Sequence, residues 1–316
     1  MIGTVHVRPV TLRCVGLLLG VALSGCGETP AEPTEMVAPT ARLATPTETA
    51  TPSPPSSPTP APTPSPTTSP TLAGAYVALG DSLAVGVGAS QRDALGYVPQ
   101  LRATLTTPSG GQPLVTSLVN LAVSGETSGS MIGGQLPQAI TTFGDIADVA
   151  LVTLDIGGND LLRLLRTEQC ASAPAGAPCR QLVAQTLAEF EANYRLILSQ
   201  LDGALAASSP DARLAVMTYF NPFSGTDAPY EAAGEFALLG ADGRLDCPTA
   251  GTDASARGMN DIIACVAEEH GAVAVDVHPA FAGLGLELTH IGSEDIHAND
   301  VGYRVIAETF AEALAP

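Results

Sequence analysis

The chain has 316 residues and a formal net charge of −19 at pH 7, and 45% of its residues are hydrophobic. The excess of negative charge argues against binding to nucleic acid and against direct docking of the folded part on anionic lipid. The hydrophobic fraction is typical of a globular protein, and the chain is long enough to form a sizeable core.

The N-terminal residues 1–25 have the composition of an export signal. A weakly basic start precedes an apolar run over residues 14–23, which is short for a membrane span. The run ends in small residues followed by Cys26, a pattern that resembles the lipobox of bacterial lipoproteins. We therefore expect an extracytoplasmic protein that is anchored to the cell membrane by lipid on Cys26. The alternative is an ordinary signal peptide with an incidental cysteine.

Residues 26–73 are mostly Thr, Pro, Ser and Ala, with few large apolar side chains. Such a segment buries too little apolar surface to offset its conformational entropy, so we expect it to be disordered. Its proline content predicts an extended, semi-rigid linker. The folded domain is expected over residues 74–316.

Five short apolar runs rich in Val, Leu and Ala recur along the domain. They are nearly continuous rather than alternating, which is typical of strands covered on both faces. Helical patterns lie between them, which predicts a parallel sheet with helices on both sides and a site beyond the carboxyl ends of the strands. The expected strands are residues 75–79, 114–121, 149–156, 213–219 and 272–277, and the main expected helices are residues 96–105, 135–143, 180–207, 253–269 and 298–314.

The first expected strand runs into a Gly-Asp-Ser-Leu segment whose serine is Ser82. A serine at a strand-to-helix turn stands at the carboxyl edge of the sheet, and its N–H lies near a helix N-terminus, where a developing oxyanion is favoured. The residue two positions after Ser82 is Ala84, so the Gly-x-Ser-x-Gly elbow of α/β-hydrolases is not present.

The second and third expected strands are followed by two further candidate groups. Gly125 offers a bare backbone N–H, and Asn159 follows two glycines and carries an amide donor. Gly125 could present its N–H to a ligand, and the Asn159 amide could donate a hydrogen bond into the same cleft. Taken alone, each residue is more typical of an ordinary turn.

His297 precedes the last expected helix and follows two acidic residues. A carboxylate beside a histidine can bind the second ring nitrogen and hold the tautomer that a general base needs. Asp295 is the preferred partner and Glu294 the reserve, and a Ser-His dyad without an acid is the third arrangement considered. His278 and His290 are weaker candidates for the base, because neither precedes a helix with a neighbouring acid.

Together and in this order, these segments resemble the SGNH (GDSL) hydrolase family, whose name gives the residues Ser, Gly, Asn and His. The match runs from Gly80 to Tyr303 and so covers nearly the whole domain. This sequence departs from the family pattern in its last block. Ala298 stands where proline is usual, and Glu294 stands three residues before His297, where the family has Asp.

The resemblance implies a flavodoxin-like, three-layer α/β/α sandwich with about five parallel strands. It also implies ester hydrolysis without metal or cofactor, with Ser82 as nucleophile and His297 as base. The Ser82 N–H, the Gly125 N–H and the Asn159 side chain would form the oxyanion hole. We expect a small acyl ester as substrate, no nucleic-acid partner, and a monomer.

Four cysteines lie in the domain, an even number that is typical of proteins in an oxidising compartment. Of the three arrangements that four cysteines allow, we predict the local one, in which Cys170 pairs with Cys179 and Cys247 with Cys265. A zinc site built from all four thiolates is the alternative, but no Cys-x-x-Cys spacing supports it.

The leading hypothesis is therefore an esterase, lipase or acylhydrolase. One alternative is an O-acetylesterase acting on cell-surface polysaccharide or peptidoglycan, and another is a catalytically inactive, surface-tethered binding module. The joint presence of Ser82, Asn159 and His297 argues against the inactive module. Residues 219–223 follow the fourth expected strand and are expected to shape an apolar acyl pocket, with a turn or a core segment as the alternatives.

Overall fold

The computed structural model of the protein describes residues 74–106, 113–226, 228–241, 243, 247 and 257–315. The expected signal sequence, the lipidation candidate Cys26 and the linker lie outside these residues. Among the helices that the structure describes, none combines the length and the apolar character needed to cross a membrane.

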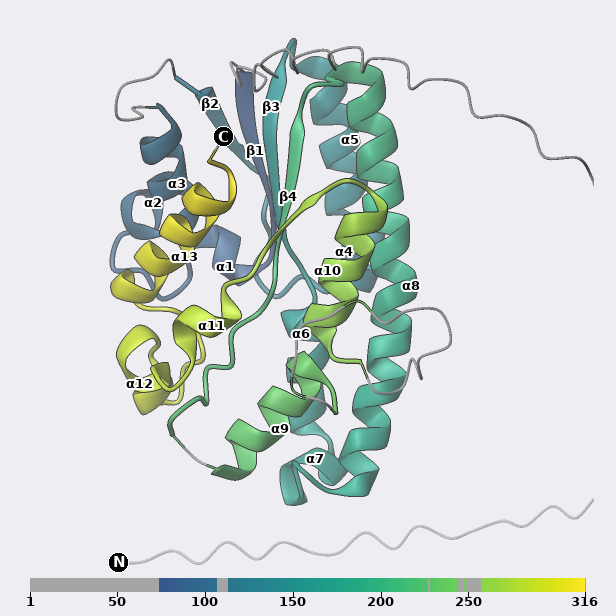
Figure 1. Cartoon of the computed structure of the whole chain (residues 1–316), viewed down its shortest axis with the longest axis vertical. Helices are drawn as coiled ribbons and strands as arrows, with labels where there is room; N and C mark the ends of the chain where they lie inside the picture. Colours follow the sequence, from purple (N-terminus) through teal and green to yellow (C-terminus); the bar gives the residue numbers. More distant parts are fainter. Residues whose placement is uncertain are drawn as a thin grey trace, which may run out of the picture. The chain divides into compact units, whose positions relative to one another are not determined.

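Five parallel strands form one sheet with the order β2-β1-β3-β4-β5 (Figure 1). Every residue of β1 and of β3 is buried, because helices cover both faces of the sheet. This explains why these strands are continuous apolar runs in the sequence. The strands are β1 (Gly74–Gly80), β2 (Val115–Asn120), β3 (Val149–Asp155), β4 (Arg213–Met217) and β5 (Val273–Val275), which confirms the five expected strands and the α/β fold class.

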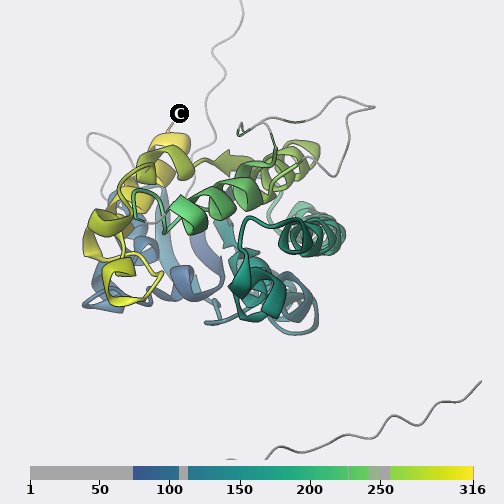
Figure 2. The same ribbon diagram turned by 90° about the horizontal axis from the view of Figure 1, so that it is seen from below.

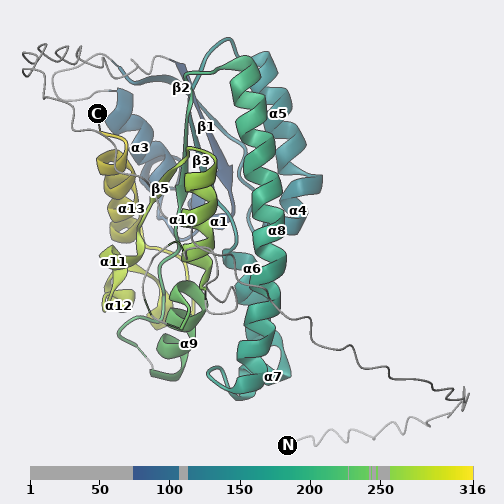
Figure 3. The ribbon, with the colours of Figure 1, turned by 45° about the vertical axis from the view of Figure 1, so that its right-hand side comes forward.

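Two helical layers complete the sandwich, and Figure 2 shows them on either side of the sheet. One layer is built around α3 and α13, where the rings of Tyr97 and Phe310 stack with their centroids 5.3 Å apart. The opposite layer is built around the long helix α8, which contacts α4, α5 and α10 (Figure 3). The bounds are α3 (Tyr97–Thr106) and α13 (Asp300–Ala313) in the first layer, and α4 (Ser128–Gly133), α5 (Gln135–Asp145), α8 (Ala177–Ser208) and α10 (Met259–Glu269) in the second.

The strand order creates a switch point between β1 and β3. From β1 the chain moves outward to β2, and it then returns to the other side of β1 to form β3. In open α/β sheets the loops diverge at such a point, and ligands bind in the crevice beyond the carboxyl ends of the strands. The segments that follow β1 and β3 carry Ser82 and Asn159, so the fold brings both residues to this crevice.

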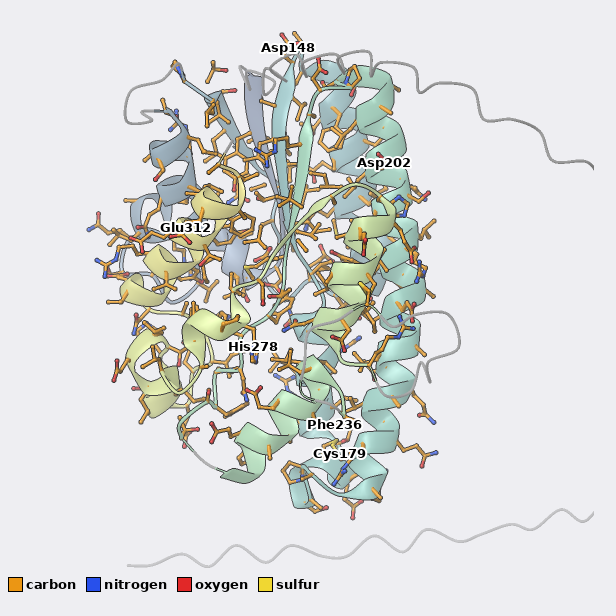
Figure 4. All side chains as sticks on the ribbon, viewed as in Figure 1. Asp148, Cys179, Asp202, Phe236, His278 and Glu312 are labelled. Carbon is orange, nitrogen blue, oxygen red and sulfur yellow. A yellow bond between two sulfur atoms is a disulfide. The ribbon has the colours of Figure 1, made fainter. Side chains whose placement is uncertain are left out.

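Several helices beyond the carboxyl edge of the sheet were not predicted from the sequence. They lie at the end of the molecule where Figure 4 labels Cys179, Phe236 and His278, opposite Asp148, which directly precedes β3. They include α6 (Gly158–Leu162), the 3-10 helix η1 (Arg163–Arg166), α7 (Glu168–Ser172) and α9 (Ala228–Leu239).

The helix boundaries differ from expectation where capping decides them. The last helix begins at Asp300 rather than at residue 298, because the Asn299 side chain accepts the N–H groups of Val301 and Gly302 and so ends the preceding extended segment. The expected helix over residues 253–269 begins at Met259 within the described chain, and residues 253–256 lie outside it.

The structure forms both local disulfides. Cys170 of α7 joins Cys179 of α8 with a Cα–Cα distance of 4.7 Å, and Cys247 joins Cys265 of α10 with a Cα–Cα distance of 5.2 Å. This pairing uses all four thiols, so the alternative of a zinc site built from four thiolates is wrong. The first disulfide closes the corner between α7 and α8, which borders the apolar pocket described below.

Candidate active site

Ser82 is the first residue of the short helix α1 (Ser82–Val85), immediately after β1. The Asp81 carboxylate caps this helix by accepting the N–H of Leu83 at 2.9 Å. Gly80 has a φ of 142°, a conformation that residues with a side chain rarely adopt. The turn that presents Ser82 therefore depends on the glycine and on the aspartate of the Gly-Asp-Ser-Leu segment.

A side-chain clamp that was not predicted from the sequence holds the end of β1. The Gly80 N–H donates to Oε1 of Gln135 at 2.6 Å, and the Gln135 Nε2 donates to the Gly80 carbonyl at 2.9 Å. Gln135 is the first residue of α5 and only 2% exposed. Because both backbone groups of Gly80 are bound by one amide, the residue two positions before the serine is fixed in orientation.

His297 reaches Ser82 from the opposite end of the sequence. Its Nε2 lies 2.9 Å from the Ser82 Oγ, and its Nδ1 lies 2.5 Å from Oδ1 of Asp295. A carboxylate can only accept, so Nδ1 carries the proton and Nε2 is free to accept from the serine hydroxyl. The three side chains form a continuous hydrogen-bonded line from acid to imidazole to hydroxyl.

The structure also distinguishes the two acids. Asp295 Oδ1 accepts the backbone N–H of His297 at 3.1 Å as well as the ring N–H. Burial raises the pKa of Asp295, but the hydrogen bonds and charge of His297 outweigh it and leave the pKa below its ordinary value. Glu294 is exposed and adopts a left-handed φ of 61° at the end of the preceding 3-10 turn. Asp295, not Glu294, is therefore the acid that contacts His297.

The loop that carries His297 is fastened to the loop that follows Ser82. The His290 Nε2 lies 2.8 Å from the Gly88 carbonyl oxygen, and the Tyr303 hydroxyl donates to the Val87 carbonyl at 2.5 Å. A Cβ at Gly88 would come within 2.9 Å of the His297 Cβ. These contacts set the serine-to-histidine distance, and none of them was predicted from the sequence.

The two other candidate histidines have partners of their own. His290 binds the Gly88 carbonyl as described, and the His278 Nε2 lies 3.0 Å from Oε2 of Glu235 on α9. Both therefore hold segments around the site together, and neither contacts Ser82 in the described structure. The reason expected for His278 is wrong, however, because His278 begins the helix α11 (His278–Phe281) and its backbone N–H donates to Oδ1 of the neighbouring Asp276 at 3.2 Å. It is the partner on α9 that engages its ring instead.

Asn159 lies beside the nucleophile turn, in the first turn of α6. Its Nδ2 donates to the Glu126 carbonyl at 2.9 Å and lies 3.3 Å from Oδ2 of Asp81. Gly125, the residue before Glu126, is exposed and has a left-handed φ of 81° that favours glycine. The structure thus brings the segment with Gly125 next to Asn159 and Asp81.

Two buried carboxyl groups lie behind Ser82. Burial raises the pKa of Asp81 to about 6, although hydrogen bonds from Leu83 and Tyr219 and the charge of His297 lower it. Burial also raises the pKa of Asp155 well above its ordinary value, and the negative charge of Asp81 raises it further. Asp155 Oδ1 accepts the backbone N–H of Asp81 at 3.3 Å, which fastens the Asp155 carboxyl to the turn that presents Ser82.

A large apolar pocket opens beside Ser82 and His297. It has about 1050 Å³ of empty space, a volume that includes open solvent at its entrance. The expected segment over residues 219–223 lines it, together with α9 and the corner between α7 and α8. Apolar lining residues include Leu161, Leu164, Val183, Phe223, Phe236 and Leu238.

Comparison with known proteins agrees with the geometry. A family model described as GDSL-like lipase/acylhydrolase matches residues 78–305. A lipase from Streptomyces rimosus is 28% identical over 210 residues, which cover 66% of this chain and 71% of the relative.

Solved structures of low sequence identity share the fold. The extracellular lipase of Streptomyces rimosus superposes with a TM-score of 0.51 at 22% identity, covering 76% of this chain and 99% of that one. A phospholipase A1 from Streptomyces albidoflavus gives 0.50 at 18% identity, covering 76% and 99%. A lipase from a goat rumen metagenome gives 0.51 at 18% identity, covering 76% and 97%.

The family match begins within β1 and ends within α13, so it includes every segment that meets at the carboxyl edge of the sheet. It also spans more than half of the chain. The chain belongs to the GDSL-like lipase/acylhydrolase family and is an ester hydrolase.

Proposed function

We propose that the protein is a serine ester hydrolase in which Ser82 is the nucleophile, His297 the general base and Asp295 the residue that orients the histidine. The observation that carries the proposal is the hydrogen-bonded line from the Asp295 carboxylate through His297 to the Ser82 Oγ. This line supplies a nucleophile, a base with the required tautomer and a fixed acid.

In this mechanism the Ser82 Oγ attacks the acyl carbon while its proton passes to the His297 Nε2. The negative charge on the carbonyl oxygen is stabilised by the N–H groups of Ser82 and Gly125 and by the Asn159 Nδ2, each worth ~3 kcal/mol. His297 then gives the proton to the leaving alcohol, and an acyl-serine remains. Water attacks the acyl-serine with His297 again as base, which releases the acid and restores Ser82.

The apolar pocket supports an acyl chain longer than acetate as the group that is transferred. Ser82 and His297 are among the residues that line it, and most of its lining surface is apolar. Each methylene buried there contributes ~0.8 kcal/mol, or about fourfold in kcat/KM, until the pocket is full. An acetyl group would contact little of this apolar lining, so the pocket favours lipase or acylhydrolase chemistry.

The chemical step is tested with p-nitrophenyl esters from acetate to dodecanoate, measured on the wild type and on Ser82→Ala. We expect kcat/KM to rise with chain length in the wild type and activity to be lost in Ser82→Ala. A fluorophosphonate should label the wild type but not the variant. Equal activity in the two proteins would refute the serine mechanism, and failure of the wild type to react at all would favour the inactive binding module.

We also propose that the enzyme acts outside the cytoplasm while anchored through lipid on Cys26. The lipobox-like segment supports this location, and two disulfides in one domain suit an oxidising compartment. Membrane fractionation of the full chain should find the wild type in the membrane and Cys26→Ser in the soluble fraction. An unchanged membrane fraction for Cys26→Ser contradicts the anchor without affecting the proposed chemistry.

A further inference from the structure

Tyr219 makes a contact that places it directly behind the oxyanion donor Asn159. Its hydroxyl donates to Oδ2 of Asp81 at 2.8 Å. The same oxygen atom lies 3.3 Å from the Nδ2 of Asn159. One carboxylate oxygen is therefore shared by a strong donor from Tyr219 and a longer, weaker one from Asn159.

The position of Tyr219 is fixed by its surroundings. Its backbone N–H donates to the Asn260 Oδ1 at 2.8 Å, and the Asn260 Nδ2 donates to the Tyr219 carbonyl at 2.8 Å. Asn260 is fully buried. The Tyr219 ring lies against Gly158, where a Cβ would come within 2.7 Å of the ring. The residue before Asn159 must therefore be small for the tyrosine to reach Asp81.

The Asn159 amide has two hydrogens to donate. The Glu126 carbonyl, at 2.9 Å, takes one of them. The second hydrogen can be donated either to Asp81 Oδ2 or to the oxyanion that forms during the reaction. The Leu83 N–H already binds Oδ1 of Asp81. Without the Tyr219 hydroxyl, Oδ2 would attract the Asn159 hydrogen more strongly, because an under-satisfied charged oxygen in a low-dielectric site is costly.

We propose that Tyr219 is a positioning residue that acts through Asp81: by occupying Oδ2, its hydroxyl leaves the second N–H of Asn159 available to the oxyanion. This inference rests on the proposed function, since it assigns Asn159 to the oxyanion hole. It goes beyond that function by adding a residue at the end of β4 that touches no reacting atom and still controls how well the hole is formed.

The test is a double-mutant cycle between Tyr219→Phe and Asn159→Ala, with kcat expressed per site titrated by a fluorophosphonate. Tyr219→Phe keeps the ring and should lower kcat ~10-fold, within the cost of a hydrogen bond to a charged group, while KM changes less than about twofold. Asn159→Ala should lower kcat ~100-fold. In the Asn159→Ala background, Tyr219→Phe should have no further effect, because the Asn159 hydrogen that Asp81 would otherwise attract is no longer present.

Tyr76→Phe is the matched control. It removes another buried tyrosine hydroxyl, which bonds Thr153 Oγ1 at 2.8 Å in the core of the sheet. Its kcat should equal that of the wild type, even though both phenylalanine variants lose a buried hydrogen bond and some thermal stability. A Tyr76→Phe effect on kcat equal to that of Tyr219→Phe would mean that general loosening explains both, and it would overturn the inference.

The remaining outcomes are also decisive. An unchanged kcat in Tyr219→Phe overturns the inference, and so does the same ~10-fold loss in both the wild-type and the Asn159→Ala backgrounds. Full activity of Ser82→Ala, in contrast, refutes the proposed function itself. The two failures are thus distinguishable by different variants.

Discussion

The reacting centre and the apolar pocket have Ser82 and His297 in common, but different interactions hold them in shape. Around Ser82 and His297, position is set by directed hydrogen bonds between single atoms, such as the Gln135 clamp on Gly80 and the His290 contact to Gly88. The pocket is set by the shape of apolar side chains from several helices. A directed hydrogen bond is lost when either of its atoms is removed, whereas packed apolar side chains can rearrange around a substitution that changes their volume. Substitutions in the first region should therefore change the rate, and those in the second should change the preferred substrate.

The largest effect is expected at the base. His297→Ala should lower kcat for every acyl chain length by at least ~10⁴-fold, because nucleophile and base act as one unit. The measurement is kcat for acetyl and dodecanoyl p-nitrophenyl esters. A loss of kcat for only one of the two esters would contradict the view that the reacting centre sets the rate and the pocket sets the substrate preference.

The next effect tests the acid. Asp295→Asn should lower kcat by ~10²-fold on all esters, because an amide cannot hold the His297 tautomer as the carboxylate does. The expected loss is smaller than for a fully buried triad, since the Asp295 side chain is 45% exposed and water partly replaces it. Glu294→Gln is the matched control in the adjacent residue and should retain wild-type kcat. A loss in Glu294→Gln as large as that in Asp295→Asn would contradict the assignment of the acid.

The pocket is tested on α9. Ala233 lines the pocket, whereas its neighbour Ala232 is exposed and absent from the lining. Ala233→Phe should fill the pocket and lower kcat/KM for the dodecanoyl ester by ~10-fold while leaving acetate within about twofold, because it removes the burial of two or so methylenes. Ala232→Phe places the same side chain on the solvent side and should leave the chain-length profile unchanged. Equal profiles for the two variants would show that the acyl chain binds elsewhere.

The smallest effect concerns stability rather than rate. Asp81 has a folded pKa of about 6, above its ordinary value of 3.8, and burial raises that of Asp155 in the same direction. The folded state therefore holds protons that the unfolded state has released. The stabilisation by these groups is fully present below the unfolded pKa and is lost as the pH rises through the folded pKa.

Asp155→Asn should flatten this dependence, because it removes one of the two buried carboxyls that hold these protons. Urea denaturation at intervals from pH 4 to pH 7 measures the free energy of unfolding of both proteins. The wild type should lose more stability over this range than the variant. Parallel curves would mean that the buried carboxyls do not titrate in this window.

Much of the fold was predictable because its signals are local. Each strand is a continuous apolar run, and this pattern reflects burial on both faces of a parallel sheet. α9 was missed, although the sequence of Ala228–Leu239 is rich in alanine and leucine. Gly234 interrupts the helical pattern of this segment. The glycine is required by a tertiary contact, because a Cβ there would come within 2.5 Å of the Asn221 side chain.

The sequence predicted the reacting residues of the candidate site, but not the residues that hold them in position. Ser82, Asn159 and His297 each stand next to an expected strand or helix, so a local pattern locates them. Gln135 and Tyr219 carry no such signal, since glutamine at a helix start and tyrosine after a strand are common. Only their contacts with Gly80 and Asp81 reveal what they do.

The order of segments along the chain was enough to bring the reacting groups to one edge. Crossovers in a parallel sheet return the chain to the same end each time, so residues that follow successive strands must meet there. The distances between these groups, in contrast, are not encoded in any local sequence pattern. Ser82 and His297 are separated by 215 positions, and Gly80 and Gln135 by 55, so their distances depend on how whole helices pack. The tyrosine behind Asn159 and the lining of the pocket follow from that packing. The choice of Asp295 over Glu294 follows from the local backbone, in which Glu294 adopts a left-handed φ of 61° and Asp295 faces His297.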